Sequence, residues 1–97
     1  MRIVIKKSTR SDKKFQATVG NRTVHFGARG YSDFTQGASK QQREAYLARH
    51  QKRENWGRSG IHTAGFYARW VLWNRPSVAA SISDLNSKFP GITFDLI

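Results

Sequence analysis

The sequence of residues 14–28, KFQATVGNRTVHFGA, decides the fold. Polar and apolar residues alternate on both sides of Gly20-Asn21, which is the period-two pattern of half-buried β-strands. Glycine and asparagine tolerate the positive φ angles that a two-residue hairpin turn requires. The stretch therefore predicts two antiparallel strands, Lys14–Val19 and Arg22–Ala28, each of which buries one face.

A further strand is expected on the N-terminal side of this hairpin. Residues Arg2–Lys7 alternate in the same way, and the polar loop Ser8–Lys13 would connect them to the hairpin. On the C-terminal side, the segment Gly27–Gly37 contains three glycines and predicts a structured loop or short turn. The N-terminal part of the chain is thus expected to form a small antiparallel sheet.

The first expected helix is basic. Ser39 and Gln42 have the spacing of a capping box, and the helix that they begin is expected to run to about Glu54. Its thin apolar stripe consists of Ala45, Tyr46, Leu47 and Ala48. Basic residues occupy most of the remaining surface, so this helix is predicted to be cationic and weakly buried.

The second expected helix carries the main aromatic stripe. Thr63 can cap its N-terminus, and the helix is expected to continue through Asn74. Phe66, Trp70 and Trp73 stand at positions i, i+4 and i+7, the spacing of one helical face. These three side chains are therefore predicted to form a core stripe.

The third expected helix has clear limits. Pro76 ends the preceding helix, Ser77 can cap the next one, and Pro90-Gly91 would terminate it. Its apolar face consists of Val78, Ile82, Leu85 and Phe89. The tail Ile92–Ile97 alternates enough to predict a short edge strand.

The order of these elements predicts the fold class. Strands come first and helices follow, which is typical of an α+β fold. We expect a small N-terminal antiparallel β-hairpin sheet packed against about three C-terminal helices. The 97 residues have the length of a single domain, residues 1–97, which should bury roughly 60–70% of the surface of the unfolded chain.

The charge of the chain points to an anionic partner. There are 17 Lys and Arg residues against 6 Asp and Glu, a formal net charge of +11. Residues 1–75 hold 16 of the basic and 4 of the acidic residues, a net of +12, whereas residues 76–97 have a net of −1. This asymmetry suggests a basic binding portion and a neutral portion used for packing.

Several functional classes find no support in the sequence. The chain has no cysteine, and His25, His50 and His62 form no metal-ligand or catalytic spacing with the carboxylates. The N-terminus lacks the apolar run of a secretory signal, and no apolar stretch approaches the roughly 20 residues of a membrane span. We therefore expect no enzyme activity, no catalytic or metal-ligating residue, no cofactor, no small-molecule substrate and no membrane span.

Candidate contacts to the anionic partner lie mainly on the first helix and the loops around it. The basic candidates are Arg29, Lys40, Arg43, Arg49, Lys52, Arg53 and Arg58. The aromatic candidates for the same interface are Tyr31, Tyr46 and Trp56. These cations suit phosphates, and the aromatic rings would add stacking with a single strand. They suit the acidic surface of another protein equally well, and the plainest alternative is a solvated cationic face.

Six segments carry a resemblance to known proteins. They are His25–Thr35, Tyr46–His50, Arg53–Trp56, Thr63–Phe66 with Trp70, Leu72–Ser77 and Ser81-Ile82. Over about residues 22–85, these segments resemble a family of short basic proteins of uncharacterised function. Large double-stranded DNA viruses of algae and protists, and some marine phages, encode that family. Where the family pattern has a charged, His- and Asp-rich segment, this chain has Gln36–Ser39, which argues against a metal or charge function there.

The resemblance implies a viral protein made in the cytoplasm or nucleus of a host cell and packaged in the virion. It leaves two functions open, with viral capsid proteins or viral DNA as the partner. A minor capsid or other structural component would bind the acidic surfaces of larger shell proteins, and a packaging protein would bind viral DNA without reading its sequence. Because the cations are rich in arginine and interleaved with aromatic residues, the composition favours the structural component. The oligomeric state stays open.

Overall fold

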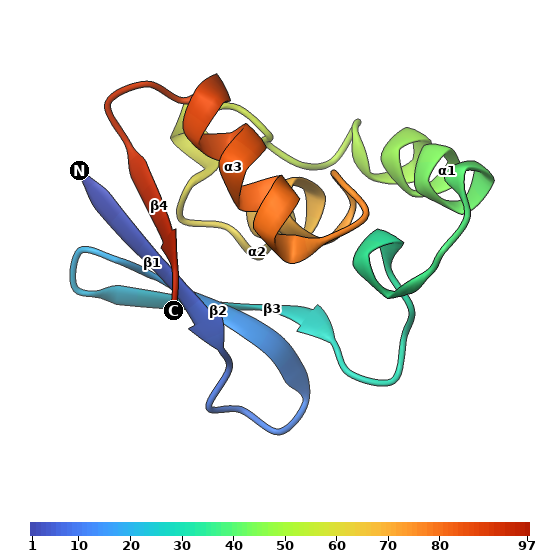
Figure 1. Cartoon of the computed structure of the whole chain (residues 1–97), viewed down its shortest axis with the longest axis horizontal. Coiled ribbons are helices and arrows are strands. Elements are labelled where there is room, and N and C mark those ends of the chain that lie inside the picture. Colours follow the sequence, from blue (N-terminus) through green and yellow to red (C-terminus); the bar gives the residue numbers. More distant parts are fainter.

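The computed structural model describes all 97 residues and contains a four-stranded sheet and three helices (Figure 1). The strands are β1 (Arg2–Lys7), β2 (Lys13–Val19), β3 (Arg22–Ala28) and β4 (Thr93–Leu96). The α-helices are α1 (Lys40–His50), α2 (Ala64–Tyr67) and α3 (Val78–Lys88). A π-helical segment, η3 (Ala68–Leu72), continues α2, and the short 3-10 turns η1 (Phe34–Gln36) and η2 (Arg58–Gly60) lie in the loops.

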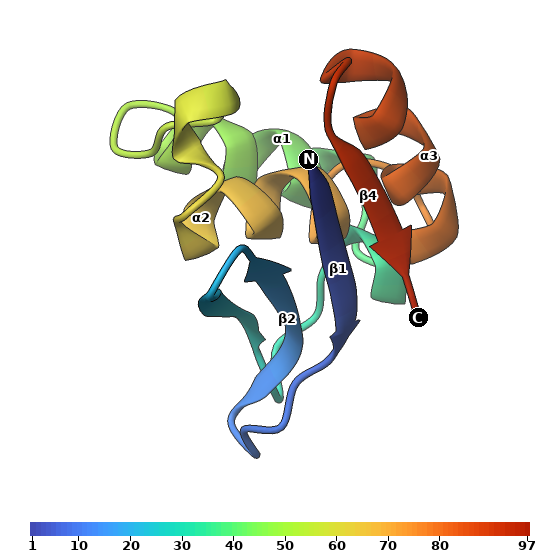
Figure 2. The ribbon, with the colours of Figure 1, turned by 90° about the vertical axis from the view of Figure 1, so that its left-hand side faces the viewer.

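The sheet has the order β3-β2-β1-β4, and the helices cover one of its faces (Figures 1 and 2). The hairpin of β2 and β3 is confirmed, with Ala17 opposite Val24 and Phe15 opposite Phe26. Gly20 has a φ of 60°, the positive value that its hairpin turn requires. The expected α+β class is therefore confirmed.

The sheet is larger than a hairpin. Strand β1 pairs antiparallel with β2, and the expected edge strand β4 pairs with the other side of β1. This last pairing is parallel, because the chain crosses over through the helices before it returns to the sheet. The first and last strands thus lie side by side, and both chain ends are at the β1–β4 edge (Figure 2).

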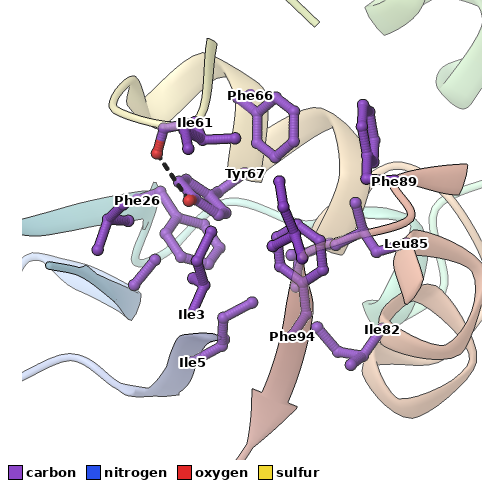
Figure 3. Packing of buried hydrophobic residues seen from close by; sticks show 14 of the residues in the cluster. Ile3, Ile5, Phe26, Ile61, Phe66, Tyr67, Ile82, Leu85, Phe89 and Phe94 are labelled. Carbon is purple, nitrogen blue, oxygen red and sulfur yellow. Dashed lines mark hydrogen bonds between the residues drawn. The ribbon is translucent and has the colours of Figure 1, made fainter. Parts of the chain in front are cut away.

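The core lies between the sheet and the helices (Figure 3). Ile3 and Ile5 of β1 and Phe94 of β4 point at it from the sheet, and each is at most 1% exposed. Tyr67 lies against Phe26, and its buried hydroxyl donates a hydrogen bond to the carbonyl of Ile61 at 2.7 Å. Because this bond satisfies the hydroxyl, a tyrosine can occupy the centre of an apolar core.

The π-helical segment changes which face of the second helix is buried. The buried pairs are Phe66-Tyr67 and Val71-Leu72, which are five residues apart. This spacing matches the Trp73 N–H bond to the Ala68 carbonyl, because a π-turn places residues i and i+5 above each other. The predicted stripe at a period of 3.6 residues is therefore wrong in part. Phe66 is in the core, whereas Trp70 and Trp73 are half-buried at its margin.

Helix α1 is shorter than predicted. Ser39 and Gln42 form the expected capping box, but the helix ends at His50 rather than near Glu54. The residues that follow offer no apolar side chain to bury, and Glu54 turns back to bond His50. The expected caps Thr63 and Ser77 of the other two helices are confirmed. No helix combines the length and the apolar composition that crossing a bilayer demands.

Gly27 tests how closely the helical layer packs against the sheet. It has a φ of 80°, and a Cβ there would lie 2.7 Å from Leu72 Cδ1 and 3.2 Å from Lys14 Cβ. Gly27→Ala should therefore lower the free energy of unfolding by about 2–4 kcal/mol, from backbone strain and overpacking together. Denaturant unfolding would measure the loss.

Gly30→Ala is the matched control. Gly30 has a φ of 90°, and a Cβ there would meet no atom within 4 Å, so only backbone strain of about 1–2 kcal/mol is expected. Equal losses in the two variants would contradict the close contact between Gly27 and Leu72.

Candidate polyanion-binding surface

Every carboxylate side chain of the protein pairs with a basic side chain. Five of the six acids pair with Lys or Arg, and the sixth, Glu54, bonds the imidazole of His50 at 2.9 Å. The five pairs with Lys or Arg are Arg2–Asp95, Arg10–Asp12, Lys14–Asp33, Arg43–Glu44 and Arg75–Asp84. No carboxylate lies within ion-pair distance of a second Lys or Arg.

Most of the cations have no acidic partner. Five of the 17 Lys and Arg residues take part in these pairs, so 12 do not. They are Lys6, Lys7, Lys13, Arg22, Arg29, Lys40, Arg49, Lys52, Arg53, Arg58, Arg69 and Lys88. All except Lys13 and Arg69 are exposed. The electrostatic potential over the surface is thus positive, and such a potential raises the local concentration of polyanions.

The loop after β3 is fixed by an ion pair with very little exposure to solvent. The Lys14 ammonium lies 2.7 Å from Asp33 Oδ2, and the two side chains are only 12% and 2% exposed. It also donates to the carbonyl of Tyr31 and, at 2.7 Å, to Gln36 Oε1. The other oxygen of Asp33 accepts from the backbone N–H of Thr35 at 2.8 Å. This network anchors residues 31–36 on strand β2.

The fixed loop separates two hollows on the surface. One has a volume of about 720 Å³ and the other about 600 Å³. Both are lined by Lys14 and by Tyr31, Ser32 and Asp33 of the loop. The larger hollow adds the unpaired cations Lys7 and Arg29, and the smaller one adds Lys13 and Arg49. The loop thus borders two hollows, each of which has unpaired cations in its lining. The smaller hollow also contains the His50–Glu54 pair.

The basic residues predicted from the sequence do not form one cluster. Arg49, Lys52 and Arg53 lie together at the end of α1, and Lys40 is at its beginning. Arg29 lies at the end of β3, where its Nε donates to the carbonyl of Lys13 at 3.1 Å. Arg58 is in another region, because its guanidinium bonds the carbonyl of Pro90 at 2.8 Å.

Arg43 is placed differently from the other predicted cations. Its Nε donates to the carbonyls of Trp73 and Asn74, both at 3.1 Å, and its Nη1 donates to Glu44. Its side chain is only 22% exposed. The structure therefore gives Arg43 the function of holding α1 against the end of the π-helical segment.

The three predicted aromatic contacts also differ from one another. Tyr46 is buried, because its ring stacks on those of Trp73 and His50. The distances between ring centroids are 4.5 Å to Trp73 and 4.1 Å to His50. Burial is the main cause that raises the pKa of its phenol above the usual value, and Glu54 adds to the effect. Trp56 is half-buried and donates its indole N–H to Glu54 at 2.9 Å. Tyr46 is thus not available to a partner, contrary to the expectation from the sequence.

Tyr31 is the one exposed aromatic residue of the protein. It is 73% exposed, whereas the other eleven aromatic residues are buried or half-buried. It stands on the anchored loop between the two cationic hollows. It is thus the one predicted aromatic contact that solvent reaches freely.

Three cations were missed by the sequence analysis at this site, namely Lys7, Lys13 and Lys14. The signal for Lys13 and the adjacent Lys14 is the register that the hairpin turn sets, whereas Lys7 needs the separate β1–β2 register. Counting back from Gly20-Asn21 places Lys13 opposite Ala28, and thus beside the loop, and the next pairing places Lys7 opposite Phe15. A register count would therefore have added them to Arg29 and Tyr31.

Arg69 was also missed, and its environment is unusual. Its guanidinium lies 4.2 Å from the ring of Trp70 and 5.3 Å from that of Trp56. The Nε and Nη1 atoms are inaccessible to solvent and have no hydrogen-bond acceptor. Burial lowers the pKa of Arg69 below its usual value, and the nearby charge of Arg43 lowers it further. The aromatic faces thus only partly replace the missing acceptors.

The remaining ionisable groups form pairs rather than larger clusters. His50 bonds Glu54, His25 bonds Ser8 at 2.7 Å, and His62 is exposed. No three His, Asp or Glu side chains come together in an arrangement that would hold a metal ion.

Comparison with known protein families gives a match over the N-terminal half of the chain. Residues 3–50 match a family described as a family of unknown function (DUF5754). The matched segment runs from β1 to the end of α1 and so contains the loop with Tyr31 and both Lys14 and Asp33. Neither the curated proteins nor the solved structures contain a significant match.

Arg43 and Arg69 allow a test of which arginine stabilises the fold. Arg43→Met would leave the carbonyls of Trp73 and Asn74 without this donor, at an expected cost of about 1–3 kcal/mol in the free energy of unfolding. Arg69→Met removes two buried donors that have no acceptor, so it should leave stability unchanged or raise it by about 1 kcal/mol. Thermal and denaturant unfolding would compare them. A loss in Arg69→Met as large as in Arg43→Met would contradict these assignments.

Proposed function

We propose that this protein binds the phosphate backbone of nucleic acid through its unpaired cations, without catalysis and without reading the base sequence. The observation that carries the proposal is the complete pairing of the six carboxylates, which leaves 12 cations without an acidic partner. Phosphate groups of a polyanion supply the missing negative charge, and the release of condensed counterions drives the association.

The placement of the aromatic residues supports nucleic acid over an acidic protein. The sequence favoured a protein partner because its cations alternate with aromatic residues, which are enriched in protein interfaces. Of the 12 aromatic residues, however, only Tyr31 is exposed. The other large exposed apolar residues are Met1 at the N-terminus and Leu96 and Ile97 at the C-terminus. A surface of this kind favours charge contacts over apolar ones.

A second candidate function is attachment to the acidic surface of a larger protein. Tyr31 favours it, because a single exposed aromatic residue surrounded by cations can anchor an interface. In the viral context that the sequence resemblance implies, the first function corresponds to packaging of viral DNA and the second to a minor capsid component. Both would place the protein in the virion.

The size of the molecule limits the number of phosphate contacts. Its extents are 34 × 29 × 24 Å, so its long axis covers roughly ten base pairs of duplex at 3.4 Å per pair. The exposed cations point in several directions, so only a part of them faces one duplex. With about four to six phosphate contacts, the slope of log K against log salt is roughly −4 to −5.

A salt series with a labelled duplex tests the proposal. Fluorescence anisotropy should show micromolar binding at low salt and a linear loss of log K with the slope above. Lys52→Gln/Arg53→Gln should weaken binding and make the slope shallower by up to about 2, because each lost phosphate contact removes about one counterion.

The matched control for this variant is Arg2→Gln/Arg10→Gln. It removes the same net charge, but from cations that already have the partners Asp95 and Asp12. Its slope should stay within about half a unit of the original value, because these cations are not the ones offered to phosphates. Absence of binding to both a duplex and a single strand at low salt, or binding that does not depend on salt, would overturn the proposal.

A further inference from the structure

We infer that the Tyr31 loop, residues 30–33, is a stacking site for an unpaired base, so that the protein prefers single-stranded nucleic acid to duplex. The inference rests on the proposed phosphate binding and adds to it the form of nucleic acid that is bound. It is carried by three features of the loop: its exposed ring, its rigid attachment and the cations on both sides.

The ring of Tyr31 is free to stack. It is 73% exposed and has no aromatic neighbour, whereas most of the other rings of the protein pack against one another. An aromatic face of this kind can receive a base of any sequence, because every base presents a π-face. This makes Tyr31 the natural contact for a base that has no partner strand.

The loop holds the ring in place before any ligand arrives. Lys14 bonds the main-chain carbonyl of Tyr31 itself and, two residues on, the carboxylate of Asp33. Asp33 is 2% exposed and caps the following 3-10 turn through the N–H of Thr35. On the N-terminal side, the Arg29 N–H donates to the carbonyl of Asp12 at 3.1 Å. Because the backbone on both sides of Tyr31 is thus fixed, stacking orders little beyond the side chain.

Unpaired cations line both hollows that Tyr31 borders, so a strand that passes over the ring can meet them. Lys7 and Arg29 line the 720 Å³ hollow, and Lys13 and Arg49 line the 600 Å³ hollow. None of the four has an acidic partner. Phosphates on either side of a stacked base would therefore meet positive charge on both sides of the loop.

A duplex cannot use this arrangement fully. Its bases are already stacked and paired, so the face of an internal base is closed to Tyr31 unless the duplex is opened at an energetic cost. A duplex can still contact the cations through its phosphates. The ring of Tyr31 thus adds affinity for a single strand that a duplex of the same length does not receive.

The experiment compares a labelled 12-nucleotide oligothymidine with a 12-base-pair duplex by fluorescence anisotropy at the same salt concentration. The wild type should bind the single strand more tightly. Tyr31→Ala should weaken single-strand binding about 5- to 100-fold, the range of one lost base stack, and change duplex binding less than about twofold. Tyr31→Trp retains an aromatic face and should keep the preference.

A strand of the same length in which every base is removed provides a second readout. The wild type should bind this abasic strand about as weakly as Tyr31→Ala binds oligothymidine, because the phosphates remain and the stack is lost. Since Tyr31 is exposed, Tyr31→Ala should keep the melting temperature of the wild type, which circular dichroism would verify.

Other outcomes would overturn the inference in distinct ways. If the wild type binds the duplex as tightly as the single strand, or if Tyr31→Ala weakens both equally, the stacking site is refuted while the phosphate binding stands. If neither nucleic acid binds at low salt, the proposed function fails as well. Tyr31-dependent binding to polyglutamate, without a preference for single strands, would overturn the inference in favour of an acidic protein partner.

Discussion

The ion pair between Lys14 and Asp33 ties the loop that carries Tyr31 to the central strands of the sheet. Lys14 belongs to the central hairpin, and Asp33 belongs to the loop that leads to α1. Both charges are nearly removed from solvent, and such a pair is stable only when further hydrogen bonds satisfy it. Tyr31, Thr35 and Gln36 supply those bonds. The pair thus holds the glycine-containing loop in a fixed position, where it lines both hollows.

The same pair is part of a charge balance that shapes the whole surface. Each carboxylate pairs with a basic side chain of the protein itself. At Asp84, burial opposes ionisation, but hydrogen bonds from Asn74 and Arg75 hold the pKa below its usual value. The cations left over repel one another in the free protein. Binding of a polyanion would relieve this repulsion and stabilise the fold by mass action. The proposed interaction surface therefore depends on charge rather than on an apolar patch.

Local signals in the sequence were sufficient for much of the fold. The period-two alternation around Gly20-Asn21 predicted the hairpin, and Ser39, Thr63 and Ser77 predicted three helix starts. These features depend on residues close together in the chain. The parallel pairing of β4 with β1 could not be predicted in this way, because it joins the two ends of the chain across three helices.

Two features of the helices depend on tertiary contacts that a local pattern does not contain. The π-turn moved Val71 and Leu72 into the core in place of Trp70 and Trp73, because a period of 3.6 residues does not hold through such a turn. Tyr46 and Arg43 were predicted as surface contacts, but they hold α1 against Trp73. At the site, sequence reasoning found Tyr31 and Arg29, whereas Lys7 and Lys13 needed the strand register.

The proposed single-strand binding requires a rigid, exposed aromatic ring beside unpaired cations at one place on the surface. A titration of isotope-labelled protein with oligothymidine, followed by backbone amide chemical shifts, locates the contact residue by residue. Binding at the Tyr31 loop predicts that the largest changes fall on residues 28–33 and on Lys7, Lys13 and Arg49 around the two hollows. Changes centred on the uncovered face of the sheet, or spread evenly over all exposed cations, would contradict it.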